Sequence, residues 1–86
     1  MSRYLGIHHA SLIVADTRRA LAFYVDILGL QVDAARPALG FPGAWLMVGG
    51  GQQIHLLELS NPDAGNARPA HAGRDRHTAL RLHGLD

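Results

Sequence analysis

Residues 8–16 read His-His-Ala-Ser-Leu-Ile-Val-Ala-Asp, an apolar run with histidine at its start and a carboxylate at its end. Because side chains alternate between the two faces of a β-strand, this run predicts a strand over Ile7–Val14 with two different faces. One face is apolar and predicts a contact with the core: Ala10, Leu12 and Val14. The other face is mixed and predicts the lining of a cleft: His9, Ser11 and Ile13.

Residues 76–86 form a weaker copy of this run. Placing His77 on His9 also places Leu80 on Leu12, so both copies carry a histidine ahead of an apolar position. A strand pattern that returns at a long interval indicates two structural modules, each opening with a histidine-bearing strand. We expect the second module to be truncated after that first strand.

A helix is predicted directly after the first strand, over Thr17–Leu28. Asp16 occupies its N-cap position, where a carboxylate can accept a hydrogen bond from an amide one turn ahead. Gly29 suits the left-handed residue that commonly closes a helix. The apolar residues that follow the helical period, and that we expect to pack on the sheet, are Leu21, Tyr24, Val25 and Leu28.

Further strands are predicted over Leu30–Asp33, Ala44–Val48 and Gln53–Leu59. Gly49–Gly51 must form a turn, because consecutive glycines lose too much entropy inside a regular element. The last two strands therefore form an antiparallel hairpin. We expect Trp45 in the core of the hairpin, with a position in the wall of the cleft as the alternative.

The resulting β-α-β-β-β order predicts an α+β fold in a single domain. Residues 1–60 make up its first module. Residues 61–75 are rich in Asn, Pro, Asp, Gly, Ala and Arg, a composition typical of a linker. Residues 76–86 are then the first strand of the incomplete second module.

Composition excludes several classes of function. The 86 residues are 48% apolar and 17% charged, as in a folded soluble domain, and the net charge of +1 gives no reason to expect a nucleic-acid partner. The sequence contains no cysteine and no lysine, which excludes disulfides, thiolate nucleophiles and a Schiff base within the chain. No apolar run approaches the ~20 residues of a membrane span, so we expect a cytoplasmic protein with no membrane partner.

The chain is rich in histidine, at positions 8, 9, 55, 71, 77 and 83. His9, His55 and His77 lie in predicted strands, and imidazole is the commonest ligand for borderline divalent metals. Their spacing matches no zinc-finger rule. A histidine on a strand is more often a hydrogen-bonded or half-exposed structural residue, so spacing alone leaves both interpretations open.

Four segments carry a recognisable pattern: His-Ala-Ser-Leu-Ile-Val-Ala-Asp (9–16), Ala-Phe-Tyr-Val-Asp-Ile-Leu-Gly-Leu (22–30), Gln-Ile-His-Leu-Leu-Glu (53–58) and Asp-Arg-His-Thr-Ala-Leu (75–80). Through them, and most specifically through Phe-Tyr-x-x-x-Leu-Gly, the chain resembles the vicinal oxygen chelate superfamily of glyoxalases, bleomycin resistance proteins and extradiol dioxygenases. The resemblance implies the glyoxalase/bleomycin-resistance/dihydroxybiphenyl-dioxygenase fold. In that fold, two βαβββ modules enclose a cleft that holds a divalent metal.

The resemblance also implies metal ligands at His9 and His77. A further ligand in the last strand of the first module falls on His55, or on Glu58 if the strand is shifted by three residues. Because three is odd, these two side chains point to opposite faces, and we favour His55. The remaining family ligand, a glutamate late in the second module, is expected beyond this chain. Such a ligand set suits Fe²⁺, Mn²⁺, Zn²⁺ or Ni²⁺.

The function implied is that of a glyoxalase-like, metal-dependent enzyme whose cation chelates vicinal oxygens of a small-molecule substrate. Lyase, isomerase and dioxygenase chemistry all remain open, and no catalytic residue is assigned. The alternative is a metal-free small-molecule or antibiotic-binding protein of the bleomycin-resistance kind. A third interpretation is that the chain is a piece of a longer protein. Because an uncovered terminal strand pairs readily with another chain, we expect a homodimer.

Overall fold

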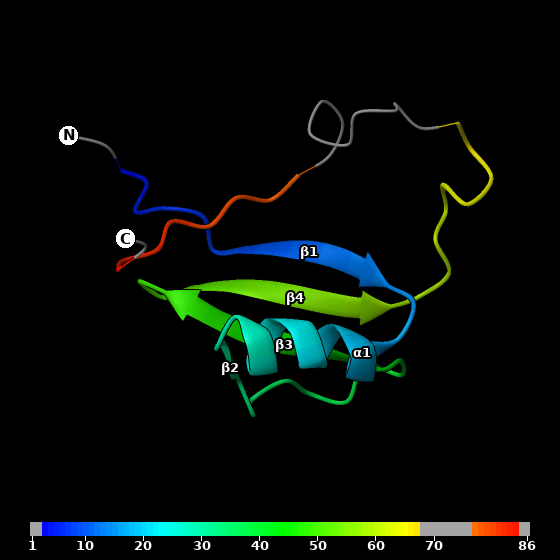
Figure 1. Cartoon of the computed structure of the whole chain (residues 1–86), viewed down its shortest axis with the longest axis horizontal. Coiled ribbons are helices and arrows are strands. Elements are labelled where there is room, and N and C mark those ends of the chain that lie inside the picture. Colours follow the sequence, from blue (N-terminus) through cyan, green and yellow to red (C-terminus); the bar gives the residue numbers. More distant parts are fainter. Residues whose placement is uncertain (1–2, 68–76, 85–86) are drawn as a thin grey trace.

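Strands and helices follow one another in the predicted βαβββ order (Figure 1). The computed structural model describes residues 3–67 and 77–84. Its elements are β1 (His9–Val14), α1 (Thr17–Leu21), η1 (Ala22–Ile27), β2 (Gln31–Val32), β3 (Gly43–Gly49) and β4 (Gln52–Glu58). The predicted α+β class is confirmed, because one helical segment and a single sheet make up one module.

The sheet has four strands in the order β1-β4-β3-β2. β3 and β4 form the predicted antiparallel hairpin, and β2 adds to the far side of β3. Gly50 and Gly51 make the hairpin turn with φ angles of 58° and 78°, a region that glycine adopts without steric cost. β1 runs parallel to β4, so the first and last strands of the module are neighbours.

The helical segment begins at the predicted Thr17 and ends at Ile27, one residue before the predicted Leu28. The Asp16 side chain accepts a hydrogen bond from the Arg19 amide at 3.2 Å, which confirms the N-cap. A second carboxylate, that of Glu58, accepts from the Thr17 amide at 2.7 Å. Gly29, with a φ of 79°, closes the segment. The start of the helix is therefore held both by its own cap and by the last residue of β4.

The winding of the helix changes after its first turn. From Ala22 to Ile27 it is a π-helix, and the Leu28 amide donates to the Phe23 carbonyl, five residues back, at 3.0 Å. A π-helix has more residues per turn, so consecutive side chains are separated by a smaller rotation about the helix axis. The predicted apolar residues therefore no longer all lie on one side of the helix. Most of them pack on the core as predicted (Leu21, Tyr24 and Val25). Leu28 is half-exposed instead.

The core lies on one face of the sheet, beneath the helix. Its fully buried members are Ala44, Leu46, Ile54 and Leu56, and the alternating residues Leu12 and Val14 of β1 pack against them. Burying an aliphatic side chain of this size stabilises a fold by about 1.5–3 kcal/mol. Because few side chains in the described part are fully buried, each contributes a large share of the stability.

The opposite face of the sheet has no helix over it in the described part of the chain (Figure 1). We call it the open face. It carries His9, Ser11 and Ile13 of β1, Trp45 and Met47 of β3, and Gln53, His55 and Leu57 of β4. The predicted division of β1 into a core face and a mixed face is confirmed. Trp45 lies on the open face and not in the core, which was the favoured expectation, because it pairs directly with His55.

The segment His77–Gly84 forms no strand, so the strand predicted over 76–86 is wrong for the residues that the structure describes. A strand requires a hydrogen-bonded ladder with a neighbour, and no such ladder joins these residues to β1. Leu80 nevertheless packs against the core. Residues 61–67 contain turns without helix or strand, whereas the predicted linker residues 68–75 lie outside the described part. Among the described helices, none has the length and apolar character needed to cross a membrane.

Candidate functional site

Three ring side chains stand in a row on the open face. The ring of His9 on β1 stacks on that of His55 on β4, with centroids 4.0 Å apart and planes 12° from parallel. The Trp45 ring on β3 stacks on His55 at 4.4 Å and 8°. The row forms because β4 lies between β1 and β3 and because the two-residue period of each strand turns these residues to the same side. Two of the predicted metal ligands are thus brought together.

A chain of hydrogen bonds orients the His55 imidazole. Asp33 Oδ2 accepts from Gln53 Nε2 at 2.8 Å, which leaves Gln53 Oε1 facing His55 Nε2 at 2.8 Å. A carbonyl oxygen only accepts, so Nε2 of His55 carries the proton and Nδ1 keeps a lone pair. The Ala35 amide also donates to Asp33, at 2.9 Å. The hydrogen bond from Ala35 lowers the pKa of Asp33 most, and the one from Gln53 lowers it further. The Asp33 carboxylate, at the start of the chain of hydrogen bonds, is therefore anionic.

The charge around His55 favours its neutral form. Burial lowers the pKa of His55, and electrostatic interaction with His9, His8 and Arg36 lowers it further. Asp33 acts in the opposite direction and contributes least. The ring is therefore held neutral, as a metal ligand or a general base must be, in surroundings that are otherwise electropositive.

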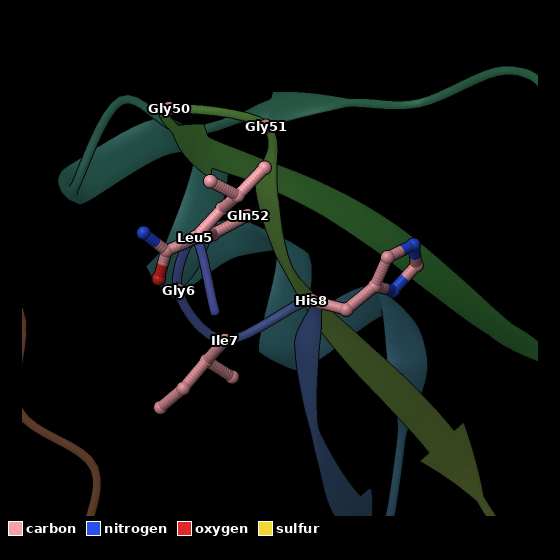
Figure 2. A pocket seen from close by; sticks show the side chains of 7 residues that line it. All are labelled: Leu5, Gly6, Ile7, His8, Gly50, Gly51 and Gln52. Atoms are coloured by element: carbon pink, nitrogen blue, oxygen red, sulfur yellow. The ribbon is translucent and has the colours of Figure 1, made fainter. Parts of the chain in front are cut away.

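His8 also turns toward His9, although strict alternation assigns it to the other face. The two Nδ1 atoms lie 2.8 Å apart. The reason is that β1 begins at His9, so the residue before it does not follow the alternation. His8 borders a hollow of about 290 Å³, which Figure 2 shows between the lead-in to β1 and the hairpin turn. Its lining is mainly apolar side chains and glycine, and the His8 side chain extends away from Leu5 and Gln52.

A smaller hollow of about 100 Å³ lies on the open face itself, beside Trp45 and His55. Its rim includes Arg36, from the loop between β2 and β3. The guanidinium of Arg36 donates to the Phe41 carbonyl at 2.8 Å and lies 5.4 Å from the centre of the Phe41 ring. This hollow combines an arginine, a neutral imidazole and aromatic walls, which makes it the best-equipped candidate site in the described part of the chain.

The structure separates the two candidates for the hairpin-strand ligand. His55 lies on the open face with His9, whereas Glu58 lies on the helix side and holds the Thr17 amide. His77, the remaining predicted ligand, is exposed and borders a third hollow with Ser11, Leu12 and Tyr24, at the free edge of β1. Figure 1 shows this last described segment passing along the β1 side of the sheet.

The donor set in the described residues is smaller than a complete metal site requires. Lone pairs of an imidazole lie in the ring plane, so the nearly parallel rings of His9 and His55 do not aim at one point without a ring rotation. No group of three or more His, Cys, Asp or Glu side chains in the described ranges could hold a metal ion. Two imidazoles suit a borderline divalent cation, and a third ligand has to come from elsewhere.

Comparison with protein families agrees with this architecture. The family model of the glyoxalase/bleomycin resistance protein/dioxygenase superfamily matches residues 6–86. The chain belongs to this superfamily. The βαβββ order of the described elements matches a partial module of the superfamily's fold.

Individual relatives point the same way. The uncharacterized protein YwkD of Bacillus subtilis (strain 168) is 35% identical over 83 residues, which cover 94% of this chain and 64% of that protein. A Bacillus anthracis protein whose name assigns it to the glyoxalase family shares 27% identity at a TM-score of 0.57, over 71% of this chain and 52% of that chain. A lactoylglutathione lyase from Agrobacterium tumefaciens shares the fold at 24% identity and a TM-score of 0.52, over 93% of this chain and 55% of that chain. The chain thus spans less than two thirds of the length of each.

Two features of the site were missed by sequence reasoning. Arg36 lies in a loop whose path no local pattern specifies, and only the folded structure brings it beside His55. The hydrogen bond between Gln53 and Asp33 reaches across β3, because Gln53 lies on β4 and Asp33 directly follows β2. The one available signal was the position of Gln53, which shares a strand face with His55.

Proposed function

We propose that this chain provides one half of the active-site cleft of a glyoxalase-like, metal-dependent enzyme acting on a small, oxygen-rich molecule. The observation that carries the proposal is the meeting of His9 and His55 on adjacent parallel strands of the open face, with ring centroids 4.0 Å apart. Family membership supports it. The residues that complete the cleft come from a second module, contributed by a longer protein or by a second copy in a homodimer, and we propose a cytoplasmic location.

A bound divalent cation would polarise neighbouring oxygens of the substrate and stabilise negative charge on them. Within this chain, His55 offers Nδ1, because Gln53 engages its other nitrogen. Gln53 and Asp33 keep the ring in that tautomer, as outer partners of a metal-bound histidine commonly do. Trp45 closes one side of the imidazole and keeps water from it. His9 supplies the second nitrogen after a rotation of its ring.

Metal titration of the full chain tests the proposal. Zn²⁺, Mn²⁺ and Ni²⁺ are titrated separately, and binding is measured by calorimetry. We expect His9→Ala and His55→Ala each to weaken metal binding by at least ~10-fold, because each substitution removes a donor. His83→Ala is the matched control, since His83 is an exposed histidine outside the open face. His77→Ala measures in parallel whether that residue contributes. Equal metal affinity in the wild type and a His9→Ala/His55→Ala double variant would refute the proposal.

A metal-free binding module is the second candidate. The stacking of Trp45, His55 and His9 favours it, because flat rings form a wall for a planar ligand and their in-plane lone pairs do not converge. Under this alternative, ligand binding to the open face is unchanged by a strong chelator. Loss of binding on chelation, restored by adding back one metal, would exclude it.

A further inference from the structure

We infer that Arg36 is the anchor for a carboxylate group of the substrate, so that the molecule bound on the open face is a small carboxylic acid. This inference deepens the proposed function and rests on it for the statement that the open face binds a substrate. The hollow beside Trp45 and His55 is the place where the acid group would meet Arg36.

The guanidinium is held in position before any ligand arrives. Its Nη2 donates to the Phe41 carbonyl at 2.8 Å, and its carbon lies 5.4 Å from the Phe41 ring centre. A Cβ added at Gly43 would lie 3.0 Å from Nη2, so Arg36 also lies against the start of β3. A side chain fixed by these contacts loses little conformational entropy when it binds a ligand.

The positive charge has no partner in the described ranges. Neither an aspartate nor a glutamate of residues 3–67 and 77–84 forms an ion pair with Arg36, and its buried Nε makes no hydrogen bond. A half-buried guanidinium without a counter-ion is costly, because part of its hydration has been removed. The remaining Nη hydrogens form a planar fork that matches the geometry of a carboxylate.

The surroundings favour an anion with an apolar body. Arg36 and the nearby histidines outweigh the one acid that acts on His55, namely Asp33, whose oxygens are already occupied by Ala35 and Gln53. The rest of the lining is largely apolar, with Leu39, Phe41, Trp45 and Leu57. A volume of about 100 Å³ suits a molecule the size of a small acid. A carboxylate at Arg36 would direct the remainder of such a molecule along the Trp45 ring.

The test uses three probes with the same ring: benzoate, the neutral benzamide and phenylphosphonate. Each is titrated into the metal-free full chain with chelator present, and binding is followed by NMR at the indole N–H of Trp45, the single tryptophan. We expect benzoate to bind and benzamide to bind at least ~10-fold more weakly, since the charge-assisted hydrogen bonds are lost. Arg36→Gln should weaken benzoate binding by a similar factor, and Arg36→Lys by less, because lysine keeps the charge without the fork.

Arg19→Gln is the matched control, because it removes the same charge from α1, on the other side of the sheet. Each variant counts as folded if the backbone amide NMR signals of residues outside the loop 33–43 match those of the wild type. The assignment is overturned if benzoate does not bind the wild type, if Arg36→Gln binds it equally well, or if phenylphosphonate binds more tightly than benzoate. Because no metal is present, failure here leaves the metal titration of His9 and His55 as an independent result.

Discussion

The carboxylate of Glu58, at the end of β4, should stabilise the module by accepting a hydrogen bond from the first turn of the helix. Its Oε1 accepts from the Thr17 amide at 2.7 Å, and Thr17 is buried. Replacing Glu58 with alanine leaves that amide without an acceptor and removes a negative charge from a helix N-terminus. A hydrogen bond to a charged group contributes about 1.5–3 kcal/mol, and partial exposure of Glu58 argues for the lower value, about 1.5 kcal/mol.

For a domain of this size, a loss of about 1.5 kcal/mol corresponds to a fall in Tm of about 6–12 °C. Glu58→Gln keeps an oxygen acceptor and loses only the charge, so we expect about half the effect. Urea unfolding followed by Trp45 fluorescence gives both values. Asp26→Ala is the control, because it removes an exposed carboxylate that makes no cap.

The result that would refute this reasoning is a Glu58→Ala variant whose free energy of unfolding lies within about 0.5 kcal/mol of the wild type, the usual scatter for surface changes. The same variant also tests the rival ligand assignment. If Glu58 only holds the helix, metal affinity measured on the folded Glu58→Ala protein is unchanged. A large loss of metal affinity would show that the carboxylate reaches the cation.

Three other predictions concern the core, a close backbone approach and pH. Leu46→Ala, at a side chain that is fully buried, should cost about 2–5 kcal/mol in urea unfolding, whereas Ile13→Ala on the open face should cost much less. Gly43→Ala should lower the Tm, because the added Cβ would overlap the Leu56 carbonyl oxygen of the paired strand; an unchanged Tm in a thermal melt would contradict this. Since the pKa of His55 lies below its ordinary 6.5, the unfolded chain binds that proton more readily. The free energy of unfolding should therefore fall as the pH drops below 6.5. The urea midpoint of His55→Gln should depend less on pH in this range than that of the wild type.

Much of the module could be predicted because its signals are local. Asp16 and Gly29 fix the ends of the helix, and the glycine turn fixes the hairpin, each through backbone chemistry that needs no distant partner. The π-helical winding had no such signal, since it depends on which carbonyl the Leu28 amide reaches once the helix packs. The strand expected around His77 failed for a related reason, because an alternating pattern becomes a strand only when a neighbour pairs with it.

Superfamily resemblance contributed an expectation that local patterns could not supply, namely that β1 and β4 line a common cleft. Alternation alone puts His9 on one face of its strand, without saying which strand lies beside it. The parallel pairing of β1 with β4 supplies the missing relation and brings His55 against His9. The position of Arg36 could not be predicted, because side chains in a loop follow no repeating pattern. It depends on the hydrogen bond that Arg36 donates to the Phe41 carbonyl.

The orientation of His55 and the stability of the sheet have a common origin in β4. Ile54 and Leu56 are buried beneath the helix, and His55 between them necessarily points to the open face. A slip of one residue in this strand would expose both apolar side chains and bury the imidazole, at a cost of several kcal/mol. The apolar residues that fix the register therefore also aim the histidine. For this reason the choice between His55 and Glu58 depends on the burial of their neighbours, and not on the chemistry of either side chain.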